Sequence, residues 1–199
     1  LAHPELPRGS LEIVFTPDEE TGKGMSLFPV AALKAAACYT FDGSRAGEIE
    51  AECFNARTVK VRIKGRSIHI GAARGKLANA VSMAASLVSM LPRSEAPEST
   101  DGWFGYYCAH EMQATLDSAF IEVFLRDFTS EGMERRVETM RAIAKAVEAQ
   151  FPLGSIDLEV VKSYENMRAK LDLRPEVLER AMEAARNVGA DPYIKPIRG

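Results

Sequence analysis

Hydrophobic and polar residues alternate most regularly in the middle of the chain, from Thr58 to Lys64. Strict alternation predicts a strand with one face in the core and one in solvent, as in antiparallel sheets. Apolar runs at Phe120–Leu125 and Ile156–Val161 predict two further strands, and the aromatic segment Trp103–Thr115 predicts another. The middle of the chain therefore favours an antiparallel sheet.

Two helices are predicted between these strands. The first ends at Pro92, and the second can begin at a cap formed by Thr129 or Ser130. Apolar residues follow helical spacing in both, at Leu77, Val81, Ala84, Leu87 and Leu91 in the first and at Met133, Val137, Met140, Ile143 and Val147 in the second. The resulting order, β-α-β-β-α-β, predicts a two-layer α+β domain of the ferredoxin-like type.

The segments on either side of this domain follow another pattern. Leu11–Phe15 and Ala35–Phe41 predict buried strands, with a short helix at Met25–Lys34 between them. Near the other end, Pro175 favours a helix start and Gly189 its C-terminal cap. The expected buried face of that helix contains Val177, Leu178, Ala181, Met182 and Ala185.

We interpret residues 1–55 and 166–199 as pieces of an α/β domain, into which the α+β domain of residues 56–165 is inserted. The flanking pieces offer few strands and helices for a core, so the α/β domain is expected to be incomplete. The chain begins at Leu1 rather than at methionine and stops on the turn-like Lys195–Gly199. These features predict a fragment of a longer chain.

Composition narrows the possible functions. With 46% hydrophobic and 27% charged residues, the chain resembles an ordinary globular protein and not a disordered one. The 25 Lys and Arg against 28 Asp and Glu argue against nucleic-acid binding. The longest apolar stretches contain serines and are too short to cross a membrane. Three cysteines without CxxC spacing favour reduced thiols in a cytoplasmic protein over disulfides or a zinc knuckle.

Carboxylates follow both predicted strands of the first piece. Glu19 and Glu20 come after Leu11–Phe15, and Asp42 comes after Ala35–Phe41. Ligands gather at the carboxyl ends of strands in open α/β sheets. One carboxylate can bind a metal while its neighbour takes a proton from metal-bound water, and zinc accepts oxygen ligands when histidines complete its shell. Spacing alone nevertheless favours a solvated acidic turn.

The segment Thr16–Gly24 reads TPDEETGKG. It resembles a segment of the peptidase T family of tripeptide aminopeptidases, in the di-zinc aminopeptidase/carboxypeptidase superfamily. Other similar segments follow in the same order along the chain, at Tyr39–Gly43, Gly47–Glu50, Phe54–Ala56, Ile68–His69, Asn79–Ala80, Arg126–Phe128, Ser163–Arg168 and Lys195–Gly199. As an ordered set that covers nearly the whole chain, these matches are specific.

The resemblance implies roles for the acidic residues. Glu19 would be the general base, Glu20 a ligand of one zinc ion and Asp42 a ligand of the other. The family also requires an upstream His-x-Asp pair, a bridging aspartate and a late histidine, and this chain contains none of them. We therefore expect the chain by itself to be inactive and to bind zinc weakly, because a catalytic zinc normally has three protein ligands.

The resemblance also implies roles in the inserted domain, which would be the lid. His69 would help to stabilise the tetrahedral intermediate, and in dimeric family members the partner subunit lends this histidine. Arg126, Arg198 and Asn79 would face the substrate. Their alternative interpretations are a surface or core histidine for His69, a polar helix position for Asn79 and a surface ion pair between Arg126 and Asp127.

Two segments depart from the family pattern. The family's His-Pro-Gly is His-Ile-Gly at His69–Gly71, which relaxes the backbone after the histidine. The family's Asp-Gly-Gly is Asp-Gly-Ser at Asp42–Ser44, a change in the turn after a predicted ligand. These departures affect how the two side chains are aimed and leave their chemistry intact.

The expected function is a zinc-dependent aminopeptidase that releases N-terminal residues from short peptides, tripeptides foremost, and forms a homodimer through the lid domain. One alternative is another amidohydrolase, carboxypeptidase or deacylase of the same superfamily. A second is a non-catalytic dimerisation or binding module, because exposed sheet edges allow strands of two subunits to pair.

Overall fold

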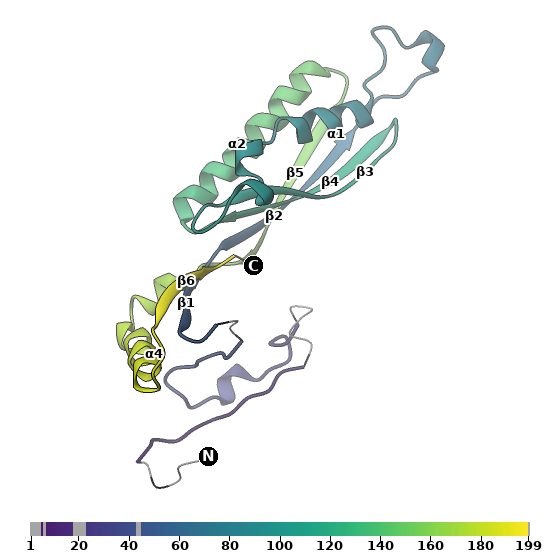
Figure 1. The fold of residues 1–199 in the computed structure, drawn as a ribbon. Coiled ribbons are helices and arrows are strands. Elements are labelled where there is room, and N and C mark those ends of the chain that lie inside the picture. The colour runs from purple at the N-terminus through teal and green to yellow at the C-terminus, as the bar shows by residue number, and fades with distance from the viewer. Residues whose placement is uncertain (1–4, 6, 18–22, 43–44, 199) are drawn as a thin grey trace. The chain divides into compact units, whose positions relative to one another are not determined.

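The computed structural model describes residues 5, 7–17, 23–42 and 45–198 (Figure 1). It divides into two compact units, Leu1–Gly43 and Ser44–Gly199. Each unit is described by itself. Within the described residues, no helix is both long enough and apolar enough to cross a membrane.

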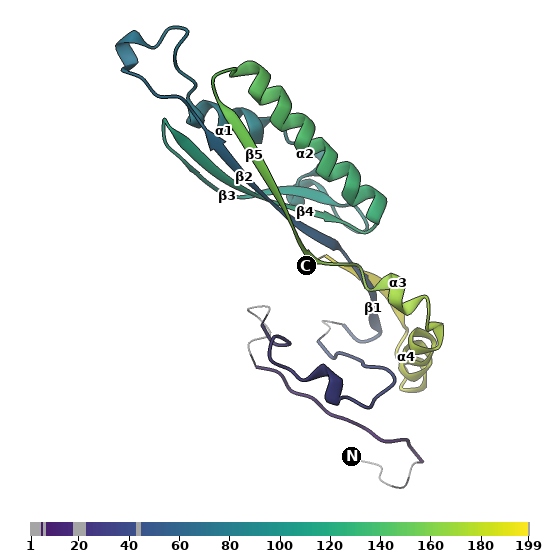
Figure 2. The same ribbon diagram turned by 180° about the vertical axis from the view of Figure 1, so that it is seen from behind.

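The larger unit contains a four-stranded antiparallel sheet in the order β3-β4-β2-β5. Its strands are β2 (Asn55–Lys64), β3 (Tyr106–Ala114), β4 (Ser118–Asp127) and β5 (Ser155–Tyr164). The helices α1 (Ala80–Ser89) and α2 (Ser130–Gln150) cover one face of the sheet (Figures 1 and 2). This arrangement confirms the predicted β-α-β-β-α-β domain.

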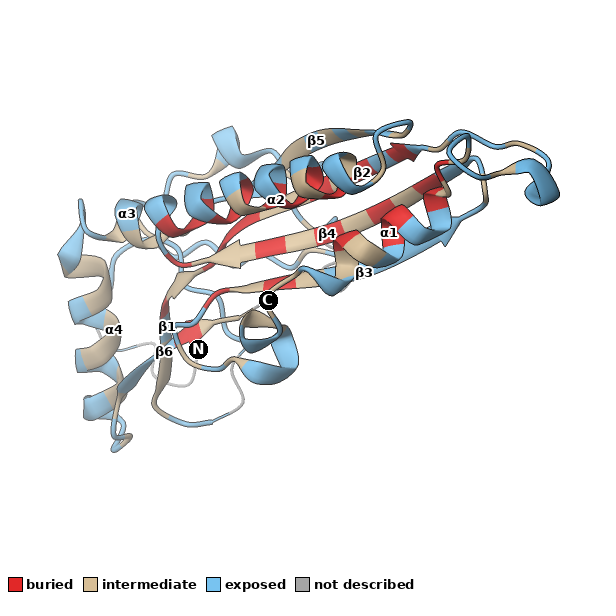
Figure 3. Ribbon diagram, turned by 90° about the horizontal axis from the view of Figure 1, so that it is seen from above, coloured by how far each residue is buried: buried red, intermediate tan, exposed pale blue. Residues whose placement is uncertain are grey.

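The central strand β2 shows why the alternating pattern predicted the sheet. Val59, Val61 and Ile63 are buried under the helices, and Arg62, which lies between them, is exposed. In the antiparallel register, Val59 pairs with Val123 of β4 on one side and with Val160 of β5 on the other. The buried residues of the sheet and of both helices form a single core (Figure 3).

The two helices begin at side-chain caps. The Oγ1 atom of Thr129 accepts a hydrogen bond from the backbone N–H of Gly132 at 2.9 Å, which confirms one of the two predicted caps. In α1 the cap is Asn79, so the helix begins after Leu77, and Val81 is 43% exposed. The actual buried positions of α1 are Ala80, Met83, Ala84 and Leu87. The cap thus fixes which helix face reaches the core.

A second, two-stranded sheet pairs segments from the two ends of this unit. The strands β1 (Glu48–Cys53) and β6 (Tyr193–Ile197) are parallel, and the sequence patterns predicted neither of them. The two segments come close together at Gly47, just before β1. Its φ is +85°, and a Cβ there would lie 2.4 Å from the carbonyl oxygen of Asp191, so this position requires glycine. The chain therefore returns after the α+β domain to the strand that precedes it.

The helices α3 (Arg168–Leu171) and α4 (Pro175–Asn187) connect β5 to β6. Pro175 begins α4 as predicted, and Gly189 follows its C-terminal cap with a φ of +81°. The predicted apolar face is only half-buried, since α4 contains no buried residue in the structure (Figure 3).

The predictions for the first 43 residues are wrong where the structure describes them. Leu11–Phe15 and Ala35–Phe41 form no strand, and the predicted helix Met25–Lys34 is reduced to turns and the 3-10 helix η2 (Val30–Ala32). The apolar residues lie in solvent, with Phe15 92% and Phe41 96% exposed. A strand needs a hydrogen-bonded partner and a surface to cover, and neither forms among these residues.

Candidate functional site

The predicted acidic centre is only partly described. Glu19 and Glu20 lie outside the described residues, and Asp42 is exposed in a segment without secondary structure. Among residues 5, 7–17, 23–42 and 45–198, no three His, Cys, Asp or Glu side chains are grouped so that they could hold a metal ion.

His69 lies in a loop between β2 and α1. Paired backbone hydrogen bonds between Arg66 and Ala78 close this loop, at 2.8 and 3.0 Å. The imidazole is exposed at the start of the short 3-10 helix η3 (Ile70–Ala72). A Cβ on Gly71 would lie 3.3 Å from His69 Nε2, so the glycine leaves room for the ring. The histidine is thus accessible from solvent.

Asn79 stands at the other end of the same loop. Its Oδ1 accepts a hydrogen bond from the backbone N–H of Val81 at 2.9 Å, which caps α1. The alternative interpretation of Asn79 as a structural position on a helix is thus matched by a specific contact. The amide nitrogen of Asn79 forms no hydrogen bond to another described residue.

Arg126 lies near the opposite end of the sheet, on β4. Its Nη1 donates to the carbonyl oxygens of Leu125 at 2.9 Å and Arg57 at 3.3 Å, and its guanidinium lies 5.2 Å from the ring centre of Phe124. Its Nε is buried and has no hydrogen-bond partner among the described residues. Arg126 therefore keeps unused donor capacity.

Asp127 does not pair with Arg126, which contradicts the alternative interpretation of a surface ion pair. Its Oδ2 instead accepts a hydrogen bond from Arg136 Nε at 2.9 Å, and Arg136 Nη1 binds Glu95 Oε2 at 2.6 Å. The guanidinium of Arg136 also lies 4.7 Å from the ring centre of Tyr107. These contacts hold the segment before β3 against α2.

Arg198 follows β6 and contacts the segment that leads into β3. Its two terminal nitrogens donate to the backbone of Thr100, Gly102 and Phe104. Tyr106, which begins β3, lies nearby, and burial raises the pKa of its phenol despite the charges of Arg126 and Arg198. The phenol therefore stays protonated at neutral pH.

Asn166 is a residue that the sequence patterns did not single out as functional. Its Oδ1 accepts from the backbone N–H of Cys53 at 3.1 Å, and its Nδ2 donates to the carbonyl oxygen of Phe128 at 2.9 Å. Its own N–H donates to Oδ1 of Asn55, which is only 4% exposed. Two sequence signals were present, namely the position of Asn166 within the matching segment Ser163–Arg168 and a polar Asn55 between apolar neighbours.

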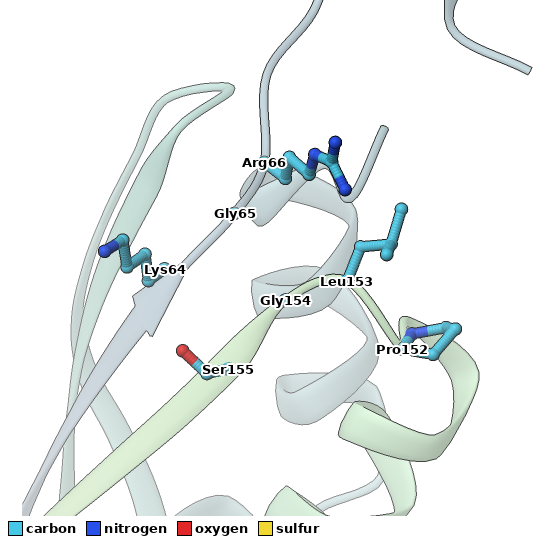
Figure 4. A pocket seen from close by; sticks show the side chains of 7 residues that line it. All are labelled: Lys64, Gly65, Arg66, Pro152, Leu153, Gly154 and Ser155. Carbon is cyan, nitrogen blue, oxygen red and sulfur yellow. The ribbon is translucent and has the colours of Figure 1, made fainter. Parts of the chain in front are cut away.

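A shallow pocket opens beside the end of β2, on the side of the His69 loop (Figure 4). Residues from the end of β2 and from the turn before β5 line it, namely Lys64, Gly65, Arg66, Pro152, Leu153, Gly154 and Ser155. None of them was a predicted site residue.

All three cysteines of the chain are free thiols, as their spacing predicted, and burial raises the pKa of Cys108.

The predicted site residues fall into two groups along the sheet. Arg126 pairs with Ala56 near the start of β2, whereas Lys64 at the end of β2 leads into the loop that carries His69. A strand of ten residues spans about 30 Å. His69 and Asn79 therefore lie at one end of the domain, and Arg126 and Arg198 lie at the other.

Comparison with known proteins places these features in context. A family model described as a peptidase dimerisation domain, of the M20 type, matches residues 52–154. The chain is 38% identical over 197 residues to Peptidase T of Caldanaerobacter subterraneus and 40% identical over 196 residues to Peptidase T of Pectobacterium carotovorum. These matches cover 99% and 98% of the chain. The chain spans about half the length of the curated relatives that it matches, 48% in each case.

Solved structures show the same fold. The aminopeptidase PepT from Bacillus cereus matches with a TM-score of 0.74 at 24% identity, over 92% of this chain and 49% of that one. A tripeptidase from Staphylococcus aureus matches with a TM-score of 0.75 at 20% identity, over 92% and 49%. Together with the curated relatives, these matches confirm the resemblance that the ordered motifs indicated.

Proposed function

The chain belongs to the M20 peptidase dimerisation family, and on this premise we propose that it forms part of a zinc-dependent aminopeptidase that releases N-terminal residues from short peptides, tripeptides foremost. The proposal is supported by relatives named Peptidase T, which are 38 to 40% identical over nearly the whole chain. It is also supported by the order of the matching motifs and by the arrangement of the site residues in the lid.

The separation of His69 from Arg126 along β2 carries the proposal about assembly. Both residues are proposed to act on one substrate, yet about 30 Å of strand lies between them. A tripeptide is too short to bridge this distance. In a two-fold homodimer, His69 of one copy can lie next to Arg126 of the other copy. Both residues can then contact the same short peptide.

In the proposed reaction, Glu19 removes a proton from the attacking water and passes it to the departing amine. His69 donates a hydrogen bond to the oxygen of the tetrahedral intermediate, where one such donor contributes about 2.7–4 kcal/mol. The guanidinium of Arg126 is positively charged and forms no ion pair among the described residues, which suits it to the carboxylate of a short peptide. Asn79 is a further residue proposed to face the substrate, and the resemblance implies the same role for Arg198.

The described residues do not make a metal site by themselves, since no three potential ligands come together. Asp42 is an exposed carboxylate and offers the oxygen donors that zinc accepts. Glu20 and Asp42 are each proposed to supply one ligand to a site completed by residues beyond this chain. Asp42→Ala should then lower the zinc content of the full-length protein, measured by elemental analysis.

The activity is tested with the full-length protein and a tripeptide. We expect release of the N-terminal residue, loss of activity with a chelator, and a decrease of about 10²–10⁴-fold in Glu19→Gln. Residues 1–199 alone should be inactive. Release of the C-terminal residue or cleavage of an N-acyl amino acid would instead indicate another enzyme of the superfamily. A full-length protein that dimerises but cleaves none of these substrates would be a binding module, which the exposed edge strand β3 favours.

Mixing two inactive variants tests the shared site. If the partner supplies His69, a dimer of one His69→Ala subunit and one Glu19→Gln subunit contains one intact site. Equal mixing should therefore restore about a quarter of the wild-type activity, because half of the dimers are mixed and each has one working site of two. Recovery should appear after the subunits exchange. No recovery in proven mixed dimers would show that each chain uses its own histidine.

A further inference from the structure

We propose that Arg198 is a positioning residue, which clamps the segment Thr100–Phe104 and so fixes the α+β domain against the β1–β6 sheet. This inference rests on the proposed peptidase function only where it concerns activity. It assigns Arg198 a role through the fold, instead of through contact with the substrate.

The hydrogen bonds of Arg198 carry the proposal. Its Nη1 donates to the carbonyl oxygens of Gly102 at 2.9 Å and Phe104 at 2.7 Å. Its Nη2 donates to the carbonyl oxygen of Thr100 at 3.0 Å and to the hydroxyl oxygen of the same residue at 2.9 Å. The acceptors are neutral, and among the described residues Arg198 forms no ion pair. A fixed guanidinium thus holds three peptide groups of one segment in a single arrangement.

Two aromatic rings also contact the guanidinium of Arg198. The ring centre of Phe54 lies 5.4 Å from its central carbon, and that of Tyr106 lies 5.9 Å away. Phe54 is fully buried and stands between β1 and β2, so it belongs to the junction of the two sheets. Cation–π attraction at this point holds the charge of Arg198 at the junction.

A second contact ties the same segment to β1. The indole nitrogen of Trp103 donates to Glu52 Oε1 at 2.6 Å. Glu52 lies on β1 and Arg198 follows β6. Both strands of the parallel pair therefore contribute a contact to the segment Thr100–Phe104. The segment leads directly into β3, which belongs to the four-stranded sheet.

The clamp reaches the predicted substrate-facing residue Arg126 through a tight contact. Gly105 follows the clamped segment, and a Cβ there would lie 2.3 Å from the carbonyl oxygen of Arg126. In the next position, Tyr106 is the register partner of Arg126. A shift of Thr100–Phe104 would therefore move the strand neighbour of Arg126. We infer that loss of the clamp lowers activity by displacing this end of the lid.

The substrate-binding role implied by the resemblance makes a different demand on Arg198. Forked binding of a carboxylate uses two N–H groups on one edge of the guanidinium. Both terminal nitrogens already donate to the backbone or hydroxyl of the clamped segment. A substrate carboxylate would thus compete with the contacts that hold the segment, and the two roles predict different experimental results.

The first test is amide hydrogen exchange of the substrate-free full-length protein, read by mass spectrometry. In Arg198→Ala, peptides that cover residues 100–106 should exchange about tenfold faster or more, because charge-assisted hydrogen bonds to three peptide groups are lost. Peptides from β4 should keep their protection, which shows that the change is local. Arg180→Lys, on the exposed face of α4, is the matched control and should change neither.

Two milder variants keep the test decisive if Arg198→Ala fails to fold. Arg198→Lys keeps the charge but cannot reach all the acceptors of the fork, so exchange in residues 100–106 should still rise. Thr100→Val removes the hydroxyl that accepts from Arg198 and donates to the carbonyl oxygen of Ala96, and it leaves the three backbone acceptors in place, so it should give a smaller increase. Unchanged exchange in all variants that fold would overturn the proposal.

The second test compares one tripeptide with a free and with an amidated carboxyl terminus. A positioning role predicts that Arg198→Lys lowers kcat/KM for both substrates by the same factor. A selective loss for the free carboxylate, with exchange unchanged, would assign Arg198 to substrate binding and overturn the clamp. If the protein cleaves neither peptide, the proposed function fails while hydrogen exchange still decides the role of Arg198.

Discussion

At the scale of single residues, the arginines of the α+β domain differ in what stabilises their charge. Arg136 is 8% exposed and is paired with two carboxylates, Asp127 and Glu95. Arg126 and Arg198 are held by carbonyl oxygens and aromatic rings and form no ion pair among the described residues. The two carboxylates neutralise the charge of Arg136, whereas neutral acceptors and aromatic rings hold the charges of Arg126 and Arg198.

Replacement of Arg136 is therefore expected to destabilise the domain strongly. In Arg136→Ala, Asp127 becomes a nearly buried carboxylate without its partner, which costs about 3–5 kcal/mol of unfolding free energy. Urea denaturation of the full-length protein measures this. Arg135→Ala on the same helix is the control, since its exposed ion pair with Glu131 contributes only about 0–1 kcal/mol. Equal losses in the two variants would show that burial of the pair is unimportant.

At the scale of elements, the helices and strands of the α+β domain form where their local patterns predict them, because the domain supplies the surface that each needs. The buried face of α1 is the exception, since Val81 is exposed there. The stripe of α2 and the alternation of β2 were both predicted and are both buried in one core. The apolar runs Leu11–Phe15 and Ala35–Phe41 have similar composition and form no strand, because no neighbouring strand pairs with them in the described residues. Local pattern sets a preference, and packing decides whether it is realised.

The pairing of β1 with β6 should depend on pH. Tyr193 Oη and Lys195 Nζ of β6 donate to the carboxylate of Glu48 on β1 at 2.8 and 3.1 Å, and these bonds lower its pKa from 4.5. A lowered pKa in the folded state stabilises the fold above pH 4.5, and the contribution is lost as pH falls through the lowered value.

The unfolding free energies of wild type and Glu48→Gln should accordingly differ most near neutral pH and converge in acid. Denaturant titrations at several pH values measure the difference. Glu50→Gln, an exposed position on the same strand, should show no such trend. A difference between wild type and Glu48→Gln that stays constant down to pH 3 would contradict the role of the carboxylate.

At the scale of the whole molecule, the junction between the two sheets of the larger unit depends on few side chains. The side chain of Asn166 contacts Cys53 of β1 and Phe128 after β4, and its backbone N–H contacts Asn55 of β2. Cys53 and Asn55 are more than a hundred residues away in the sequence, and Phe128 is 38 residues away. Arg198 connects the same junction from β6. Directional polar contacts therefore act at this junction together with the packing of Phe54 on Phe128 and Tyr106.

Asn166→Ala should loosen this junction. It leaves the N–H of Cys53 and the carbonyl oxygen of Phe128 without partners, at about 1–3 kcal/mol for a buried group. Limited proteolysis should then cut residues 164–168 faster, while the core helices stay intact. Asn166→Asp should act similarly, because an oxygen would face the carbonyl oxygen of Phe128. Gln113→Ala, on the exposed part of β3, is the control. If both Asn166 variants are cleaved at residues 164–168 no faster than this control, Asn166 does not stabilise the junction.

The sequence by itself determined the order of elements in the α+β domain, the cap at Thr129 and the family motifs, because periodicity, caps and short motifs act over a few neighbouring residues. Only the tertiary structure showed that β1 pairs with β6 and that Asp127 forms its ion pair with Arg136 instead of Arg126. It also showed that the length of β2 separates His69 from Arg126. It also placed Arg198 on the carbonyl oxygens of Thr100–Phe104. These contacts join residues that are distant in the chain, and local pattern carries no information about which distant groups will meet.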